Sequence, residues 1–178
     1  MRRAILLGLV VCCALPRDVR AQVIPGIGMT RADSRAEATA YRGRVHDELT
    51  AVLAEWSRCA EQRDSVGLSQ LYTEAARSRA TGVEDAAGPG GILVQLRALK
   101  VEGAQVYFTV DDFDTSGDFG YLASSLTLQP TGQGGPASTT EARAVFVMLR
   151  DFRGRWHIRH QSIALSPRLD SSAKPGHP

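Results

Sequence analysis

The spacing of hydrophobic residues along this chain changes from the period of a helix to that of a strand. Between residues 34 and 99, apolar side chains recur every three or four positions, which places each group of them on one face of a helix. A long first helix is predicted to begin at Ser34, which has capping-box spacing to Glu37. Its predicted buried face comprises Val45, Leu49, Val52, Leu53, Trp56 and Ala60.

Two shorter helices are predicted to follow. Asp64 and Ser65 offer side-chain oxygens that can cap a second helix. Its apolar residues recur at i, i+3, i+4 and i+7, and they are Leu68, Leu71, Tyr72 and Ala75. A third helix is predicted to open at Gly88 and Pro89, because proline is favoured in the first helical turn. The residues that it buries are Ile92, Leu93, Leu96 and Leu99.

After Lys100 the pattern alternates residue by residue, as it does in strands. Strands are predicted over about residues 106–110, 119–128, 141–150 and 155–165. Ser116–Gly117 and residues 152–154 fit hairpin turns, and the Gly- and Pro-rich segment 129–138 fits a long hairpin loop. Helices first and an antiparallel sheet last is the order of elements in an α+β domain.

Residues 1–21 have the features of a signal peptide. A pair of arginines precedes an apolar run that ends at Leu15 and is too short to span a bilayer, and Ala21 closes a sequence that fits signal-peptidase cleavage. The alternatives are a buried N-terminal helix and lipid anchoring at Cys12 or Cys13. We expect an exported protein, periplasmic or extracellular, with no membrane attachment after the signal peptide is removed.

The predicted domain covers residues 34–165. Residues 22–33 contain Pro and Gly without periodicity and are expected to form a flexible leader. Residues 166–178, with three prolines, are expected to form a disordered tail.

Charge and cysteine content change once the signal peptide is set aside. The sequence has 21 Lys and Arg against 19 Asp and Glu, and removal of residues 1–21 leaves 17 and 18, so the formal net charge changes from +2 to −1. The remainder has no basic cluster interleaved with aromatic residues, which argues against nucleic-acid binding. Cys59 is then the sole cysteine, which excludes an internal disulfide and predicts a buried thiol.

Four short motifs occur in order along residues 34–165. They are Trp56-Ser57-Arg58-Cys59-Ala60 with Asp64 and residues 68–72, Gly91-Ile92 with Leu96, residues 116–121, and residues 145–150 with 154–160. In this order they resemble the nuclear transport factor 2-like superfamily, within its SnoaL-like and uncharacterised secreted branches. The resemblance implies a strongly curved antiparallel sheet packed on three N-terminal helices. This sheet forms a cone whose open end admits a small ligand.

Strict strand alternation selects His160 as the first candidate for that pocket. Trp156, Ile158, His160 and Ser162 share one face of the last predicted strand. Sequences with this resemblance often carry histidine at both alternating positions after Trp and Ile, but Ser162 fills the second position here. Neither a histidine pair nor a metal site is therefore expected. The alternative for His160 is a satisfied structural role.

Asp112 alternates with Phe108 and Val110, so strict strand alternation would point all three to the same face. Asp112 could then act as a general base inside an apolar cone. The alternative is turn chemistry, which selects Asp at a strand end. Trp56 and Tyr72 lie on predicted buried helical faces. Their side chains could either pack in the core or form part of the pocket wall. The candidate pocket residues are Trp56, Tyr72, Phe108, Asp112, His160 and Ser162.

These features favour an exported module that binds a small apolar ligand in the cone or serves a structural role, without a cofactor. The alternative is a cofactor-independent lyase, isomerase or hydrolase with His160 or Asp112 as base, and a third hypothesis is a protein-interaction adaptor. A cone filled by Trp56, Phe108 and Trp156 would favour the structural role. His160 beside a carboxylate in a cavity would favour the enzyme.

Both faces of the predicted sheet carry apolar residues. On strand 141–150, Phe146 and Met148 lie on one face, and Val145, Val147 and Leu149 lie on the other. Because an exposed apolar sheet face needs cover, a homodimer is predicted.

We expect the exported form of the protein to begin at Gln22. The charged start, the short apolar run and the small residue Ala21 are the features that signal peptidase recognises. The intact mass of protein recovered from the periplasm or medium of the host measures this. Soluble protein that retains residues 1–21 would contradict the prediction.

Overall fold

The computed structural model describes residues 31–131 and 139–166, with side chains described from Ser34 onward. The predicted signal peptide lies outside the described residues, as do residues 22–30 of the leader and residues 167–178 of the tail. The helices are α1 (Arg31–Glu61), α2 (Ser65–Gln70) and α3 (Gly88–Ala98). The strands are β1 (Tyr72–Ala80), β2 (Ala86–Ala87), β3 (Ala104–Ser116), β4 (Phe119–Pro130), β5 (Thr140–Arg150) and β6 (Trp156–Leu165).

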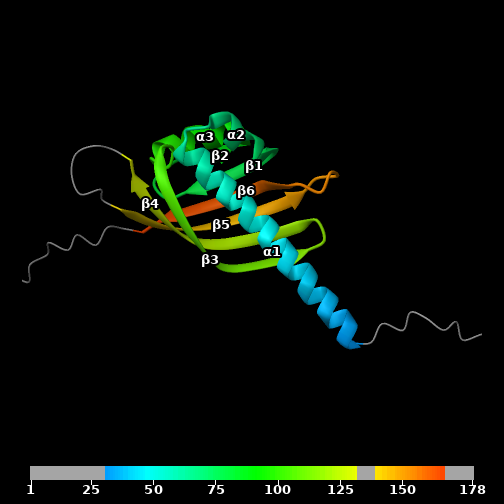
Figure 1. Ribbon diagram of the computed structural model, residues 1–178. Coiled ribbons are helices and arrows are strands. Elements are labelled where there is room, and N and C mark those ends of the chain that lie inside the picture. The colour runs from blue at the N-terminus through cyan, green and yellow to red at the C-terminus, as the bar shows by residue number, and fades with distance from the viewer. Residues whose placement is uncertain (1–30, 132–138, 167–178) are drawn as a thin grey trace, which may run out of the picture.

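Helix α1 lies across one face of the sheet, and its N-terminal end extends beyond the sheet edge (Figure 1). Its buried apolar side chains are Val45, Leu49, Leu53, Trp56, Cys59 and Ala60, which confirms the predicted face apart from the partly exposed Val52. The helix begins at Arg31, so Ser34 lies within it and is not its N-cap. In the described part of the chain, no helix is both long and apolar enough to cross a membrane.

The predicted second helix is correct at its start and wrong at its end. The Asp64 carboxylate accepts a hydrogen bond from the backbone N–H of Gly67 at 2.8 Å, as expected of an N-cap. However, α2 ends at Gln70, and both Tyr72 and Ala75 belong to strand β1. The apolar spacing fits a helix, but residues 72–80 instead pair with β6, and this tertiary pairing outweighs the local pattern.

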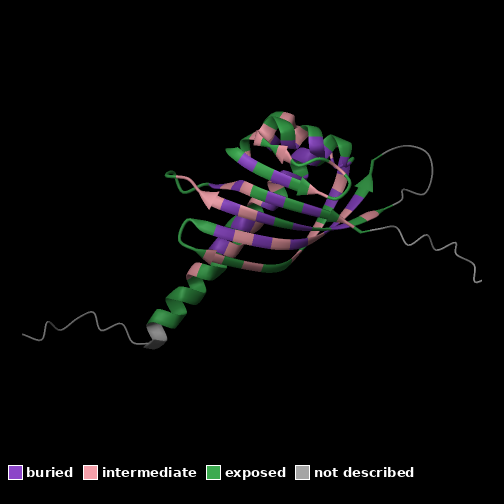
Figure 2. Cartoon of the chain, turned by 180° about the vertical axis from the view of Figure 1, so that it is seen from behind, coloured by how far each residue is buried: buried purple, intermediate pink, exposed green. Residues whose placement is uncertain are grey.

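The sheet has the strand order β2-β1-β6-β5-β4-β3. Strands β3 to β6 form the predicted antiparallel hairpins, whereas β1 pairs with β6 in parallel, so the sheet is mixed. Strands β1 and β2 are the two that the hydrophobic pattern did not indicate. Together with the confirmed helix α3, whose first turn contains proline, they complete an α+β fold in which the curved sheet wraps around α1 (Figures 1 and 2).

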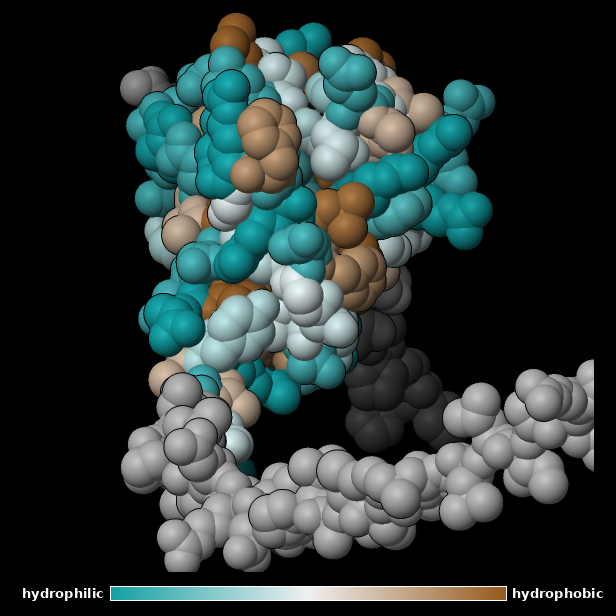
Figure 3. All heavy atoms as spheres, turned by 90° about the vertical axis from the view of Figure 1, so that its right-hand side faces the viewer, coloured by the Kyte–Doolittle hydropathy of each residue, from teal (hydrophilic) through white to brown (hydrophobic). Residues whose placement is uncertain are grey.

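We call the sheet face that packs on α1 the inner face and the opposite one the outer face. Buried and exposed residues alternate along the strands, as Figure 2 shows. Phe146 and Met148 are fully buried on the inner face, while Val145 is 42% exposed on the outer face. On the side of the molecule seen in Figure 3, hydrophobic residues form small patches between hydrophilic ones.

The homodimer stays a prediction. We expect the second copy on the outer face of β3 and β4, because two large side chains there, Tyr107 and Phe119, are more exposed than Val145 on β5. Tyr107 is 51% exposed on this part of the face. A Tyr107→Arg variant should therefore be monomeric in light scattering at tens of micromolar, whereas the wild type should have twice the chain mass. Phe152→Arg, at a residue that is 92% exposed in the turn between β5 and β6, should remain a dimer. A monomeric wild type would contradict the prediction.

Candidate functional site

A β-bulge places His160 on the outer face of the sheet, so its predicted position is wrong. Val147 pairs with His160 and Met148 pairs with Ile158, which leaves Arg159 as an extra residue on β6. Trp156 and Ile158 point inward before the bulge, and Gln161 and Ile163 point inward after it. His160 and Ser162 are consequently exposed.

A second bulge has the same effect on Asp112. Val110 pairs with Ser124 and Asp112 pairs with Ala123, so Asp111 is the extra residue on β3. Phe108 packs against the core as predicted, but Asp112 is exposed and accepts a hydrogen bond from the Tyr121 hydroxyl at 2.6 Å. Asp112 lies within β3 and not at the end of a strand, where turn chemistry would select it.

The two residues proposed as bases do not approach each other. His160 lies on β6 and Asp112 on β3, and strands β5 and β4 separate them. Two other candidate pocket residues that could have bound His160 are also engaged elsewhere, since Asp112 binds Tyr121 and Tyr72 binds core residues. The structure therefore brings Trp56, Tyr72 and Phe108 to the interior, but it leaves Asp112, His160 and Ser162 outside.

The interior contains a chain of hydrogen-bonded polar side chains that the hydrophobic pattern did not reveal. The indole Nε1–H of Trp56 donates to the Tyr72 hydroxyl at 2.6 Å, and that hydroxyl donates to Gln161 Oε1 at 2.6 Å. Gln161 Nε2 donates to Ser78 Oγ at 2.9 Å, and Ser78 Oγ donates to Gln95 Oε1. All five side chains are at most 5% exposed.

The chain ends at the backbone, because Gln95 Nε2 donates to the carbonyl oxygen of Glu84 at 2.6 Å. Each of the five side chains has a hydrogen-bond partner, and none of their polar atoms is among the buried atoms without one. Burial raises the pKa of the Tyr72 phenol well above its ordinary value, which keeps the hydroxyl protonated as the chain requires. We call Trp56, Tyr72, Gln161, Ser78 and Gln95 the buried polar chain.

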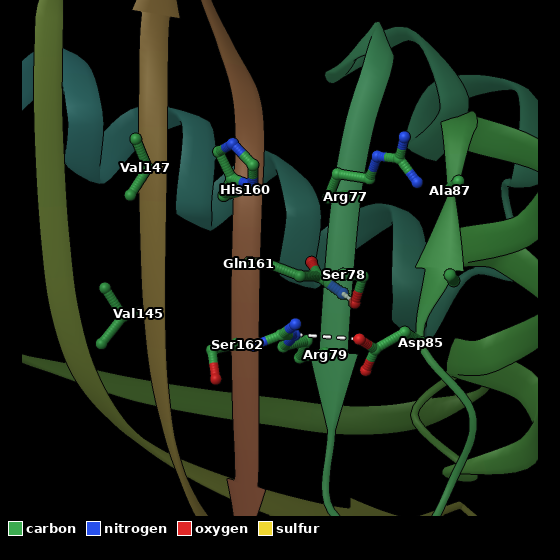
Figure 4. Close-up of a pocket in the computed structure, with 11 residues that line it drawn as sticks. Arg77, Ser78, Arg79, Asp85, Ala87, Val145, Val147, His160, Gln161 and Ser162 are labelled. Atoms are coloured by element: carbon green, nitrogen blue, oxygen red, sulfur yellow. Dashed lines mark hydrogen bonds and ion pairs between the residues drawn. The ribbon is translucent and has the colours of Figure 1, made fainter.

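Directly outside this chain, a groove of about 580 Å³ opens on the outer face of β5, β6, β1 and β2 (Figure 4). Val145 and Val147 line one side, and Arg77 and Arg79 line the other. His160 lies between these two sides. Ser78 and Gln161 also contribute to the lining, so the groove reaches the buried polar chain through the β1–β6 pair.

The two arginines of the groove differ in their partners. Arg79 forms an ion pair with Asp85, with 2.9 Å between Nε and Oδ2 (Figure 4). Arg77 is exposed, and within residues 31–131 and 139–166 its side chain has no hydrogen-bond or ion-pair partner. The groove therefore presents one unneutralised guanidinium beside an exposed imidazole and a surface of two valines. We call it the outer groove.

A histidine–carboxylate pair at the β5–β6 hairpin has a structural role. His157 Nε2 lies 3.2 Å from Asp151 Oδ2, and His157 Nδ1 lies 3.2 Å from the carbonyl oxygen of Gln70. The backbone N–H of Arg155, with further hydrogen bonds from His157 and Arg153, lowers the pKa of the Asp151 carboxyl to about 2. Both ring nitrogens are engaged, so neither is available to a substrate.

Other reactive residues do not form a site in the described part of the chain. No group of three or more His, Cys, Asp and Glu side chains is placed there to hold a metal ion. Cys59 is fully buried, as predicted, and burial raises the pKa of its thiol to about 11, which keeps the sulfur protonated and unreactive at neutral pH.

Comparison with known proteins yields structural neighbours only. No family model matches the sequence, and no curated protein matches it. An NTF2-like protein with a cystatin-like fold from Novosphingobium aromaticivorans is 19% identical with a TM-score of 0.62, and the match covers 83% of this chain and 95% of that one. A ketosteroid isomerase-like protein from Erwinia carotovora atroseptica is 15% identical with a TM-score of 0.58, covering 68% and 96%.

A conserved protein from Planctomyces limnophilus is also 15% identical with a TM-score of 0.58, and the match covers 71% of this chain and all of that one. At these identities the likeness establishes a common fold and carries no information on the reaction or the ligand. The solved structures thus confirm the fold that the sequence motifs implied.

A Tyr72→Phe substitution should destabilise the fold without changing its shape. It removes the hydroxyl that joins Trp56 to Gln161, which leaves a buried donor and a buried acceptor without partners, at a cost of about 1–3 kcal/mol. Chemical denaturation of wild type and variant measures this. Tyr41→Phe removes a hydroxyl whose hydrogen bond to the carbonyl oxygen of Gly117, at 3.3 Å, is exposed, and it should change the free energy of unfolding by less than about 0.5 kcal/mol. Equal effects at the two positions would contradict a stabilising role for the buried polar chain.

Proposed function

We propose that this protein, which has the NTF2-like fold, is an exported, non-catalytic module that binds a small molecule in the outer groove. In this proposal the interior of the cone serves as the hydrophobic core, and the sheet supplies a rigid platform for binding. The observation that carries the proposal is the outer groove itself. There Arg77, which lacks a partner among the described residues, and the apolar side chains of Val145 and Val147 line one concave surface.

Binding inside the cone is disfavoured because side chains fill the interior. Trp56 is fully buried and contacts Phe146 edge to face, with 5.6 Å between ring centroids. Trp156 is only 6% exposed, and Phe108 packs against the same core. Close-packed aromatic rings leave a ligand little room without displacing part of the core. This is the arrangement that favours a structural interior over an active site.

Catalysis is disfavoured by the positions of the acid and base groups. His160 and Asp112 lie on strands that two others separate, and the imidazole of His157 has both nitrogens engaged. General acid–base catalysis needs such groups within hydrogen-bond reach of one reacting atom. The isomerase-like name of one structural neighbour describes that protein, and a shared fold does not transfer the activity.

The groove has the rigidity that a binding site needs. Its residues come mainly from β5, β6 and β1, which pair along most of their length, and the buried polar chain fixes β1 and β6 from behind. Binding to a preformed surface costs less conformational entropy than binding to a mobile loop. The strand pairing therefore fixes the backbone positions of Arg77, His160 and Val147 before a ligand binds.

The uncharged dye N-phenyl-1-naphthylamine, which fluoresces in apolar surroundings, tests the site. We expect wild type to bind the dye and Val145→Asn to bind it several-fold more weakly, because the substitution places a polar amide on the apolar side of the groove. Val145 is 42% exposed, so the variant should fold, and thermal melting verifies this. Val147→Thr, which keeps the side-chain shape, serves as a second variant.

Phe152→Ser is the control for binding to exposed apolar residues elsewhere, since Phe152 is 92% exposed and lies outside the groove. Dye affinity that both valine variants leave unchanged, or that Phe152→Ser alone reduces, would overturn the proposed function.

A further inference from the structure

We infer that the ligand of the outer groove is an organic anion whose negative group binds Arg77 and whose apolar body lies on Val145 and Val147. This inference rests on the proposed function and adds the chemical class of the ligand. Three features of the groove lead to it, namely the charge that remains unpaired, the distance between the charged and apolar sides, and the polar groups between them.

The unpaired charge is positive. Among the described residues that line the groove, Asp85 is the only carboxylate, and its pairing with Arg79 neutralises both. Arg77 then supplies the remaining formal charge, on a planar group with several donors that matches carboxylate, sulfonate and phosphate groups. A cationic ligand would be repelled by this guanidinium, and it would find no unpaired carboxylate in the described lining to bind its charge. The groove therefore discriminates against cations.

The register of the strands orders the groove from charged to apolar. Arg77 of β1 pairs with His160 of β6, and His160 pairs with Val147 of β5, so these three side chains form one row on the outer face. Neighbouring strands lie about 4.8 Å apart, which places the Cα atoms of Arg77 and Val147 about 10 Å apart. A ligand that uses both ends of the row therefore carries its negative group several ångströms from its apolar part.

Polar groups lie between the two ends. Ser162 of β6 pairs with both Arg79 and Val145 in the next row, and its exposed hydroxyl can donate to an oxygen of the ligand. His160 stands beside Arg77 and can donate a further hydrogen bond from its imidazole. Figure 4 shows both side chains on β6, whereas the Arg77 guanidinium extends from β1 toward Ala87, and all three residues line the groove. The groove thus holds an anionic group by several donors and the remainder of the ligand by apolar contact.

Two dyes that share an aromatic body test the charge preference. One is 8-anilinonaphthalene-1-sulfonate, which carries a sulfonate, and the other is N-phenyl-1-naphthylamine, which does not. We expect Arg77→Gln to weaken binding of the sulfonate dye about tenfold, since hydrogen bonds to a charged group are lost, and to change binding of the uncharged dye by less than about twofold. Arg77→Lys, which keeps the charge without the planar fork, should give an intermediate affinity for the sulfonate dye.

Arg143→Gln is the matched control, because Arg143 is exposed on the outer face of β5 but does not line the groove. It should leave both affinities unchanged. If Arg77→Gln changed neither affinity, or lowered both equally, while Val145→Asn still weakened the uncharged dye, the anion preference would be overturned and the binding site would stand. If neither dye responded to Val145→Asn or Val147→Thr, the proposed function would fail.

Light scattering of Arg77→Gln provides a last check on what occupies the groove. We expect its mass to equal that of the wild type. A change from dimer to monomer, together with no effect on either dye, would mean that a second copy of the chain covers the groove, and it would overturn the inference.

Discussion

The hydrogen bond between Tyr72 and Gln161 is the interaction on which the remaining structure depends. It joins β1 to β6 inside the core, and it connects through Trp56 to α1 and through Ser78 and Gln95 to α3. Buried polar side chains are costly unless each finds a partner, so the whole chain is stable only when all these elements are in place together. Packing of the helices and pairing of the strands are therefore coupled through one set of hydrogen bonds.

The β-bulge at Arg159 makes this bond geometrically feasible. Without the extra residue, strict alternation would point Gln161 outward and His160 inward, and Tyr72 would lose its acceptor. The bulge also brings Ile163 into the core beyond Ile158. One inserted residue thus decides which side chains of β6 stabilise the interior and which remain on the surface.

Much of the fold could be predicted from periodicity, while the positions of the site residues could not. The patterns of α1, α3 and the four antiparallel strands are long enough to identify each element without its neighbours, and they match the structure except that β3 runs to Ser116, beyond the predicted end at residue 110. Strand β1 was missed because its first residues continue a helical spacing, and only pairing with β6 makes it a strand. His160 and Asp112 were placed on the wrong face because each follows a bulge, which depends on the register of the neighbouring strand.

The same bulge links the stability of the core to the chemistry of the surface. By turning Gln161 inward to complete the buried polar chain, it turns His160 outward into the row with Arg77 and Val147. Restoring regular alternation would return an imidazole to the cone only by removing the acceptor of Tyr72 and the donor to Ser78. An interior site built on His160 and a satisfied core are therefore mutually exclusive in this sequence. Function that uses His160 belongs to the outer face.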